Sequence, residues 1–361
     1  MTPTTALLRD VLPGVSRSFG LSLRLLPTAL ATPLGVTYLV ARAADTIADT
    51  RAFPPSERER LVEALRTALR TGDARPLEPL AAHVSPGHPS AERGLLERLP
   101  DVLAAHRALT PADRARAEAV LLTLTQAMLD ALRRFPPENA GRVEALETLA
   151  ELDRYTYTNA GCVGEFWTDM VLAHRPSCRG WDLPRMRQLG ARFGQGLQLV
   201  NVLRDLPRDL RIGRSYLPRT ELASLGLKPG QLLNPANGPR LRPLVERLVD
   251  AALDCLEDGA AYTEAVTRRE VRLRLACALP LLIALGTLAR LRAAENLLDP
   301  AVLVKVPRGE VRRHIAWTPA LAFSNRAFRG YVGRLRATTQ SPRPPRPGID
   351  PGAATSSGAS G

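Results

Sequence analysis

Apolar residues recur at intervals of three and four along almost every long segment of this 361-residue chain. This spacing places apolar side chains on one face of an α-helix, whereas a half-buried strand would show strict alternation. Alternating runs bounded by Asn-Gly or Asp-Gly turns do not occur in the sequence. The pattern therefore predicts an all-α fold.

Prolines and charged residues set the limits of the expected helices. Pro33, Pro111 and Pro184 stand where we expect first helical turns, which tolerate the missing N–H. The longest uncharged apolar stretch, between Arg274 and Arg290, is shorter than the ~18–20 residues that cross a bilayer, so we predict a core helix and no transmembrane anchor. We expect helices at about 5–12, 16–26, 33–50, 56–71, 92–107, 111–134, 142–154, 155–173, 184–210, 219–225, 239–266, 270–294 and 308–330.

The composition predicts one folded domain followed by a tail. Hydrophobic residues make up 45% and charged residues 24%, which is ordinary globular usage and excludes a wholly disordered chain. No shift in composition divides residues 1–337, and the Pro- and Gly-rich segment 72–91 is interpreted as a loop within the domain. Residues 338–361 are rich in Ser, Pro and Gly, so we predict a disordered tail.

Charge and cysteine usage bound the partners and the compartment. A formal net charge of +13 favours an anionic partner: nucleic acid, an anionic membrane surface or a phosphorylated substrate. The four cysteines are far apart and the five histidines show no HExxH spacing, which argues against a disulfide scaffold or a zinc site. Arg9 and Asp10 precede any long apolar run, so no secretory signal is visible. We expect a cytoplasmic protein, with peripheral contact with a membrane left open.

Two segments carry polar oxygen ligands four residues apart. Asp45 and Asp49 lie about 40° apart on one helix face and about 6 Å apart along the axis, and Asn201, Asp205 and Asp209 follow one stripe in the same way. Magnesium prefers hard oxygen ligands and is usually held by one or two carboxylates plus substrate phosphates. Two such helices facing each other across a bundle would bind magnesium and diphosphate together. Ion pairing with neighbouring arginines is the alternative.

Five stretches, taken in chain order, carry a resemblance to a known family. They are Ser16-Arg17-Ser18-Phe19; Tyr38 to Asp49; Tyr155 with Ala160-Gly161-Cys162-Val163-Gly164; Gln198 to Asp209 with Gly213-Arg214 and Tyr216-Leu217-Pro218; and Cys277-Ala278-Leu279-Pro280 with Val304-Lys305-Val306-Pro307-Arg308-Gly309. Over roughly residues 14–330 the sequence resembles the squalene/phytoene synthase family of head-to-head prenyl transferases, most of all its squalene synthase branch.

The resemblance implies a fold and a reaction. The fold is a single-domain isoprenoid-synthase-type helical bundle around a central apolar cavity. The reaction is the magnesium-dependent head-to-head condensation of two farnesyl diphosphates through presqualene diphosphate, followed by NADPH-dependent reduction to squalene. No GxGxxG motif is present, so NADPH binding rests on the resemblance alone.

The same resemblance assigns roles to individual residues. Tyr155, Asp45 and Asp205 are the expected catalytic residues, and Lys305 and Arg308 are the expected NADPH-binding residues. The expected magnesium ligands are Asp45, Asp49, Asp205 and Asp209. The expected substrate-binding residues are Ser16, Arg17, Ser18, Phe19, Arg42, Gln198, Asn201, Arg204 and Arg214. For Arg42, an ion pair with Asp45 three residues away is as well supported as a phosphate contact.

Some positions depart from the family pattern or have two interpretations. Pro207 in the second acidic segment predicts a kink that would turn Asp209 away from Asp205. Asn159 and Glu165 in the tyrosine segment introduce polar groups that would change the polarity of the cavity. Gly161 and Gly164, also in the tyrosine segment, imply close approach of either a second helix or a prenyl chain.

Three alternatives stay open at this point. Within the family, the chain would be a phytoene synthase acting on two geranylgeranyl diphosphates, or an enzyme that stops at presqualene diphosphate. A family fold without activity would serve as a partner-binding subunit. An arginine-rich nucleic-acid-binding protein is disfavoured by 4% aromatic residues and by acidic stripes on the helices that would face phosphate, so we expect no nucleic-acid partner.

Overall fold

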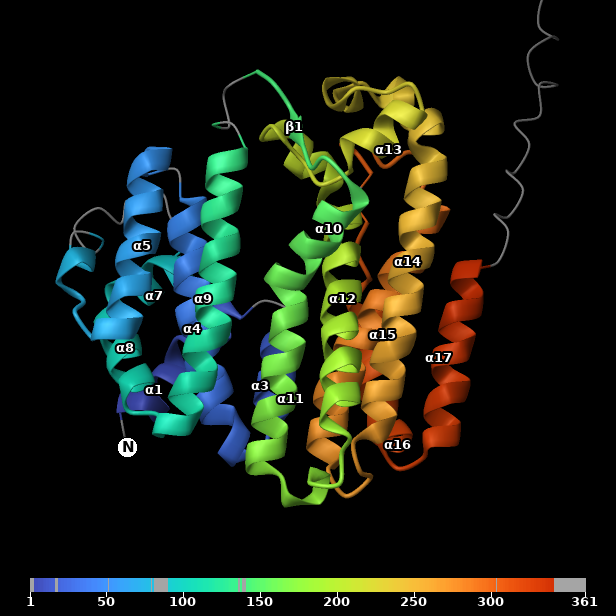
Figure 1. Ribbon diagram of the computed structural model, residues 1–361. Coiled ribbons are helices and arrows are strands. Elements are labelled where there is room, and N and C mark those ends of the chain that lie inside the picture. Colours follow the sequence, from blue (N-terminus) through green and yellow to red (C-terminus); the bar gives the residue numbers. More distant parts are fainter. Residues whose placement is uncertain are drawn as a thin grey trace, which may run out of the picture.

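Long helices run side by side through the molecule, with shorter elements at both ends (Figure 1). The computed structural model describes residues 3–16, 19–50, 52–78, 80, 90–135, 137, 141–302 and 304–340. Its elements are α1 (Pro3–Asp10), α2 (Leu12–Val15), α3 (Phe19–Leu25), α4 (Thr28–Asp49), α5 (Pro55–Thr71), η1 (Arg75–Leu77), α7 (Ser90–Glu97), α8 (Leu99–Arg107), α9 (Pro111–Arg134), β1 (Glu144–Ala145), α10 (Leu149–Thr156), η2 (Tyr157–Gly161), α11 (Cys162–His174), η3 (Pro176–Cys178), α12 (Leu183–Arg211), β2 (Arg214–Ser215), α13 (Arg219–Ser224), η4 (Pro229–Leu233), η5 (Pro235–Asn237), α14 (Gly238–Ala265), α15 (Val271–Ala293), α16 (Arg308–Ala322) and α17 (Asn325–Gln340). The predicted all-α fold is confirmed.

Several expected helix limits are wrong. The range 142–154 holds β1 before α10 begins, and the range 308–330 is two helices, the second of which continues to Gln340. Pro33 lies inside α4 rather than in its first turn, whereas Pro111 and Pro184 do stand in first turns. The rest of the expected tail, from residue 341 onward, lies outside the described residues.

Glycines bring α11 and η2 against α12. A Cβ built on Gly164 would lie 1.9 Å from the carbonyl oxygen of Gly190, and one on Gly194 would lie 2.3 Å from that of Ala160. A Cβ on Gly161 would lie 3.3 Å from the carbonyl oxygen of Ala191. These glycines therefore permit the close approach of a second helix that one of the two interpretations of the glycine segment expects.

The two-residue strand β2 follows α12 and pairs in parallel with β1, which precedes α10. Gly213 has φ +79°, a left-handed conformation that glycine adopts without steric cost, and it ends the helix. The chain then pairs Glu144 with Arg214 and Ala145 with Ser215. The backbone of Arg214 is thereby fixed beside the end of α12.

Helix α15 includes arginines near both of its ends and is longer than the uncharged stretch between them. By length and composition alone, the whole helix could cross a membrane. Most of its apolar stretch is buried inside the bundle, and a core helix passes the same test. Its burial agrees with the predicted core helix.

Candidate active site

Two adjoining chambers lie between the long helices. The first is a mainly apolar cavity of about 550 Å³, lined from α3, α4, α9, α11, α12, α14 and α15. The second is a polar mouth of about 510 Å³, in which the two acidic segments meet. The residues that line both are Asp45, Met128, Tyr155, Asn159, Gln198, Asn201 and Arg204. A charged group in the mouth and an apolar chain in the cavity could therefore belong to one molecule.

The structure brings the four predicted aspartates to this mouth. Asp45 and Asp49 come from the last turns of α4, and Asp205 and Asp209 come from the end of α12. Helix α12 continues through Pro207 to Arg211, and the Asp209 side chain is only 13% exposed. The predicted divergence of Asp209 from Asp205 is wrong, because both line the same mouth.

Burial raises the pKa of Asp209 to about 6. The nearby carboxylates of Asp205 and Asp49 act in the same direction, while Arg208 and Arg214 oppose them. A buried carboxylate beside two others is stabilised by any cation that enters the mouth. The carboxylates of the mouth therefore fit a bound divalent metal ion.

Arginines pair with these carboxylates. Arg204 makes a bidentate contact with Asp205, at 2.8 Å from Nε to Oδ1 and 2.7 Å from Nη2 to Oδ2. The Nη1 atom of Arg214, on β2, lies 3.7 Å from Oδ1 of Asp49, on α4. The two acidic segments are thus each neutralised by guanidinium groups, as the ion-pairing alternative expected.

The buried side chain of Arg42 joins two acidic residues. It contacts Asp45 on its own helix and Glu92 on α7. Both terminal nitrogens are therefore engaged by carboxylates, which favours the ion-pair interpretation of this residue over the phosphate contact.

The carboxylates do not form a closed metal cage. Within the described residues, no three His, Cys, Asp or Glu side chains gather closely enough to hold an ion by themselves. Magnesium usually keeps several waters and shares its carboxylates with substrate phosphates. Two facing pairs of aspartates suit that mode of binding, because diphosphate oxygens would complete the ligand set.

Tyr155 stands where the cavity meets the mouth. Its ring stacks on Tyr216 with centroids 4.3 Å apart, and its hydroxyl accepts a hydrogen bond from Nε2 of Gln198 at 3.3 Å. Burial raises the pKa of Tyr155 well above its usual value, so the phenol stays protonated at neutral pH. The π-helical turn η2 follows, and within it Nδ2 of Asn159 donates to the carbonyl of Tyr155 at 2.8 Å.

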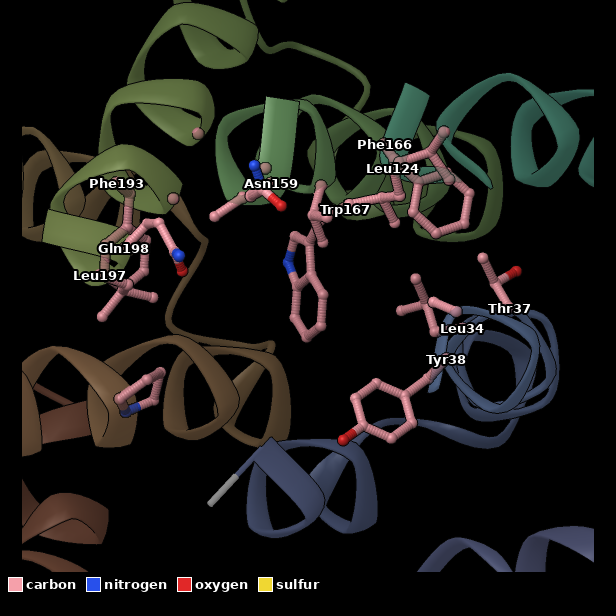
Figure 2. A pocket seen from close by; sticks show the side chains of 18 of the residues that line it. Leu34, Thr37, Tyr38, Leu124, Asn159, Phe166, Trp167, Phe193, Leu197 and Gln198 are labelled. Atoms are coloured by element: carbon pink, nitrogen blue, oxygen red, sulfur yellow. The ribbon is translucent and has the colours of Figure 1, made fainter. Parts of the chain in front are cut away.

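The indole of Trp167 occupies the middle of the cavity (Figure 2). On one side of it lie Phe193, Leu197 and Gln198, and on the other side lie Leu34, Leu124 and Phe166. Burial raises the pKa of the Cys277 thiol, which also lines this cavity, to about 12, and the Trp167 indole acts in the opposite direction. The indole thus stands between two groups of lining side chains.

The remaining predicted residues differ in their placement. Ser16 lines the cavity and is 1% exposed. Arg17 and Ser18 lie outside the described residues, as does the side chain of Phe19. Lys305 and Arg308 are exposed and line neither chamber. Asn159 lines both chambers, whereas Glu165 lines neither and instead accepts a hydrogen bond from Tyr157 at 3.1 Å.

Sequence reasoning missed three residues of this site. Tyr216 lies in the fourth of the five stretches, but its sequence neighbours give no sign of the stack with Tyr155. Trp167 lies on an apolar helix where an aromatic residue is ordinarily core. Glu92 follows a segment of sequence rich in proline, and no local signal connects it with Arg42, fifty residues earlier.

Comparison with known proteins identifies the family. The squalene/phytoene synthase family model matches residues 12–310. The chain belongs to this family. The squalene synthase of Eremothecium gossypii is 26% identical over 90% of this chain and 68% of its own length. The bifunctional lycopene cyclase/phytoene synthase of Arthroderma gypseum is 32% identical over 45% of this chain, a match that covers 27% of the relative. Squalene synthase family members are prenyltransferases, and so is this chain.

Solved structures of the squalene synthase type share the fold. A complex of TcSQS with the ligand BPH1237 has a TM-score of 0.71 at 20% identity, covering 94% of this chain and 98% of the other. The squalene synthase HpnC from Alicyclobacillus acidocaldarius has a TM-score of 0.54 at 20% identity, covering 78% and 90%. The predicted isoprenoid-synthase helical fold is therefore confirmed.

Proposed function

We propose that this squalene/phytoene synthase family member condenses two farnesyl diphosphates head to head to presqualene diphosphate, with Mg²⁺ as cofactor. The observation that carries the proposal is the junction of an acidic mouth with an apolar cavity through shared residues such as Asp45 and Tyr155. A prenyl diphosphate has the same two parts. Asp45, Asp49, Asp205 and Asp209 would hold the metal, which when bound supplies positive charge to the leaving diphosphate.

The side chains of the mouth would bind and orient the diphosphate. As carboxylates turn to the incoming metal, Arg204 and Arg214 would exchange them for phosphate oxygens, for which guanidinium groups are suited. The C1–O bond then breaks and diphosphate leaves with the electron pair. The apolar lining of the cavity excludes water from the allylic cation.

The second prenyl chain supplies the electrons for the new bonds. Its double bond attacks C1 of the cation, and loss of a proton closes the cyclopropane ring of presqualene diphosphate. The neutral phenol of Tyr155 stands at the junction, where it can steady the cation and relay this proton to the released diphosphate.

Reduction of presqualene diphosphate to squalene by NADPH stays a prediction from the resemblance. The exposed Lys305 and Arg308 line neither chamber, so they build no nucleotide site beside the acidic mouth or the apolar cavity.

Product analysis tests the proposed function. Purified protein with Mg²⁺ and farnesyl diphosphate should release diphosphate and form presqualene diphosphate, as identified by mass spectrometry, and no turnover should occur with EDTA. Added NADPH should yield squalene if the reductive step is present. Turnover of geranylgeranyl diphosphate alone would identify a phytoene synthase instead, and no turnover of either substrate would favour the partner-binding subunit.

A further inference from the structure

Arginines stand beside aspartates on the face of α12 that borders the acidic mouth. Among the described residues that line the mouth, the aspartates outnumber the arginines by one, so the arginines offset most of the negative charge there. The three arginines are Arg204, Arg208 and Arg214. They differ in their exposure and in their contacts, which indicates that they do not have the same role.

Two of these arginines are engaged by other groups of the protein. Arg204 makes its bidentate contact with Asp205. The side chain of Arg214 is only 14% exposed, and its guanidinium lies 3.7 Å from Asp49 and 6.0 Å from the centroid of the Phe135 ring. Both guanidinium groups must therefore loosen an existing contact before they can bind an anion that enters the mouth.

Arg208 is the most exposed of the three arginines. Its side chain is 69% exposed, against 39% for Arg204. Its Nε atom lies 3.8 Å from Oδ1 of Asp209, which is too far for a hydrogen bond. Within the described part of the chain, the Arg208 side chain makes no other ion pair and donates no hydrogen bond. Its guanidinium is therefore available to an anion from solution.

The exposure of Arg208 places its charge at the solvent-exposed edge of the mouth, here called the rim. Asp209, the next residue, is only 13% exposed and lies deeper. The end of α12 that carries both residues leads into β2, which pairs with β1 at one end of the bundle (Figure 1). The field of an exposed charge extends about 10 Å at an ionic strength of about 0.1 M. An anion that approaches the mouth therefore meets Arg208 before it meets Asp209.

We propose that Arg208 captures the diphosphate group of the incoming substrate at the rim of the mouth. This inference rests on the proposed function, and it concerns a residue to which the resemblance assigns no role. A diphosphate carries several negative charges, which the carboxylates of the mouth repel. The exposed guanidinium of Arg208 attracts the same group and can form bidentate contacts with its oxygens. Arg208 therefore acts on the association of the substrate with the protein.

A capturing charge at the rim has a kinetic signature. Removal of such a charge changes the association rate and its dependence on salt more than it changes dissociation. Electrostatic attraction raises association rates at low ionic strength and loses its effect as salt screens the charges. A residue that only stabilised the fold of α12 would not give an association rate with this salt dependence.

Stopped-flow tryptophan fluorescence tests the proposal in Mg²⁺ buffer. The probe is farnesyl thiolodiphosphate, an unreactive analogue in which sulfur replaces the bridging oxygen at C1. Trp167, in the middle of the apolar cavity, reports the entry of the prenyl chain. The measurement is made at pH 8.5, well above the pKa of about 6 of Asp209, so that this carboxyl is ionised with or without Arg208 beside it.

Charge at position 208 should set the association rate. Arg208→Gln should lower the association rate constant about fivefold at low salt, and the difference should disappear at about 0.5 M salt. Arg208→Lys keeps the charge and should restore most of the rate. The control Arg211→Gln removes an exposed cation of the same helix that lines neither chamber, and it should associate as the wild type does.

Inorganic diphosphate identifies the part of the substrate that Arg208 contacts. Calorimetric titration with this probe in Mg²⁺ buffer should show weaker binding to Arg208→Gln than to the wild type, because the guanidinium meets the headgroup alone. A loss seen with the farnesyl analogue and not with inorganic diphosphate would place Arg208 against the prenyl chain and overturn the proposal.

Two further results would overturn the proposal. They are an association rate of Arg208→Gln equal to that of the wild type at low salt, and an equal loss in Arg211→Gln. Circular dichroism checks that each variant is folded. Equal association by Arg208→Gln, together with turnover of farnesyl diphosphate by the wild type, would overturn this inference and leave the proposed function standing. Failure of the wild type to bind the analogue would overturn both.

Discussion

The rings of Tyr155 and Tyr216 stack with their planes 21° from parallel, at the junction of the apolar cavity and the acidic mouth. Tyr216 in turn meets the edge of Phe135, over whose ring the guanidinium of Arg214 lies 6.0 Å from the centroid. A continuous series of aromatic and cationic groups thus links the expected catalytic tyrosine to a cation of the mouth. Because the two rings limit each other's rotation, the Tyr155 hydroxyl is held in place before substrate arrives.

Replacing Tyr155 by Phe keeps the stacked ring and removes the hydroxyl. If the phenol relays the proton, kcat for presqualene diphosphate formation should fall by about 100-fold, with little change in KM. Tyr157→Phe is the matched control, because Tyr157 is nearby, bonds to Glu165 and lines neither chamber. Wild-type turnover by Tyr155→Phe would exclude the phenol from the proton relay.

Asp45 and Asp205 lie on different helices but line one mouth, so each should be required for magnesium-dependent release of diphosphate. Asp45→Asn and Asp205→Asn should each lower magnesium-dependent diphosphate release by at least about 100-fold, because charge stabilisation of the leaving group is lost. The exposed Asp101, paired with Arg98 at 3.1 Å, provides the control Asp101→Asn. Steady-state rates measure diphosphate release, and far-UV circular dichroism checks that each variant keeps its helical fold. Unchanged rates in the Asp45 and Asp205 variants would contradict the metal-binding role.

Local spacing in the sequence predicts the helical architecture and the shared helix face within each acidic segment, because carboxylates four residues apart share a face whatever the tertiary structure. The meeting of the two acidic segments is tertiary, and its prediction depends on the resemblance to the family. Close packing at Gly164 was foreseeable for a related reason, since glycine in a helix is retained where another backbone approaches.

The partners of these residues could not be predicted. Arg42 meets Glu92, and Tyr155 meets Tyr216, only because distant segments pack together. The expected kink at Pro207 does not turn Asp209 away, since α12 continues to Arg211 and Asp209 lines the same mouth as Asp205. Pairings of this kind are set by the three-dimensional fold and leave no periodic signal in the chain.

The raised pKa of Asp209, about 6, gives stability a defined pH dependence. A carboxyl whose folded pKa exceeds its unfolded value, about 4, binds more protons in the folded state between the two. This residue therefore lowers the free energy of unfolding as pH rises from about 4 through about 6. Asp209→Asn should raise the free energy of unfolding at pH 7.5 by roughly 2 kcal/mol in metal-free buffer, as measured by urea denaturation, and the gain should vanish near pH 4.

Magnesium binding should show the opposite dependence on pH. Protonated Asp209 is a poor ligand, so calorimetric titration of Mg²⁺ with inorganic diphosphate should give weaker binding at pH 5.5 than at pH 7.5. Asp209→Asn should bind weakly at both. Tight binding by this variant at pH 7.5 would show that Asp209 is not a ligand.

The position of Trp167 in the middle of the apolar cavity makes it a candidate determinant of the prenyl chain length that the site accepts. Trp167→Leu should enlarge the cavity and raise kcat/KM for geranylgeranyl diphosphate relative to farnesyl diphosphate by about tenfold, while destabilising the fold. Trp181→Leu is the control, because the Trp181 indole bonds to the carbonyl of Ala265 and lines neither chamber. An unchanged substrate ratio in Trp167→Leu would place the determinant elsewhere.

Two glycines in helices should respond in opposite ways to the same substitution. A Cβ on Gly164 would overlap the backbone of Gly190, so Gly164→Ala must separate α11 from α12 and should cost about 1–3 kcal/mol of unfolding free energy or more. A Cβ on Gly333 in α17 meets nothing within 4 Å, so Gly333→Ala should stabilise by about 0.5–1 kcal/mol through helix propensity alone. Urea denaturation measures both. Because Gly164 also borders the apolar cavity, its variant should lose prenyltransferase activity as the helices move apart, whereas Gly333→Ala should keep it.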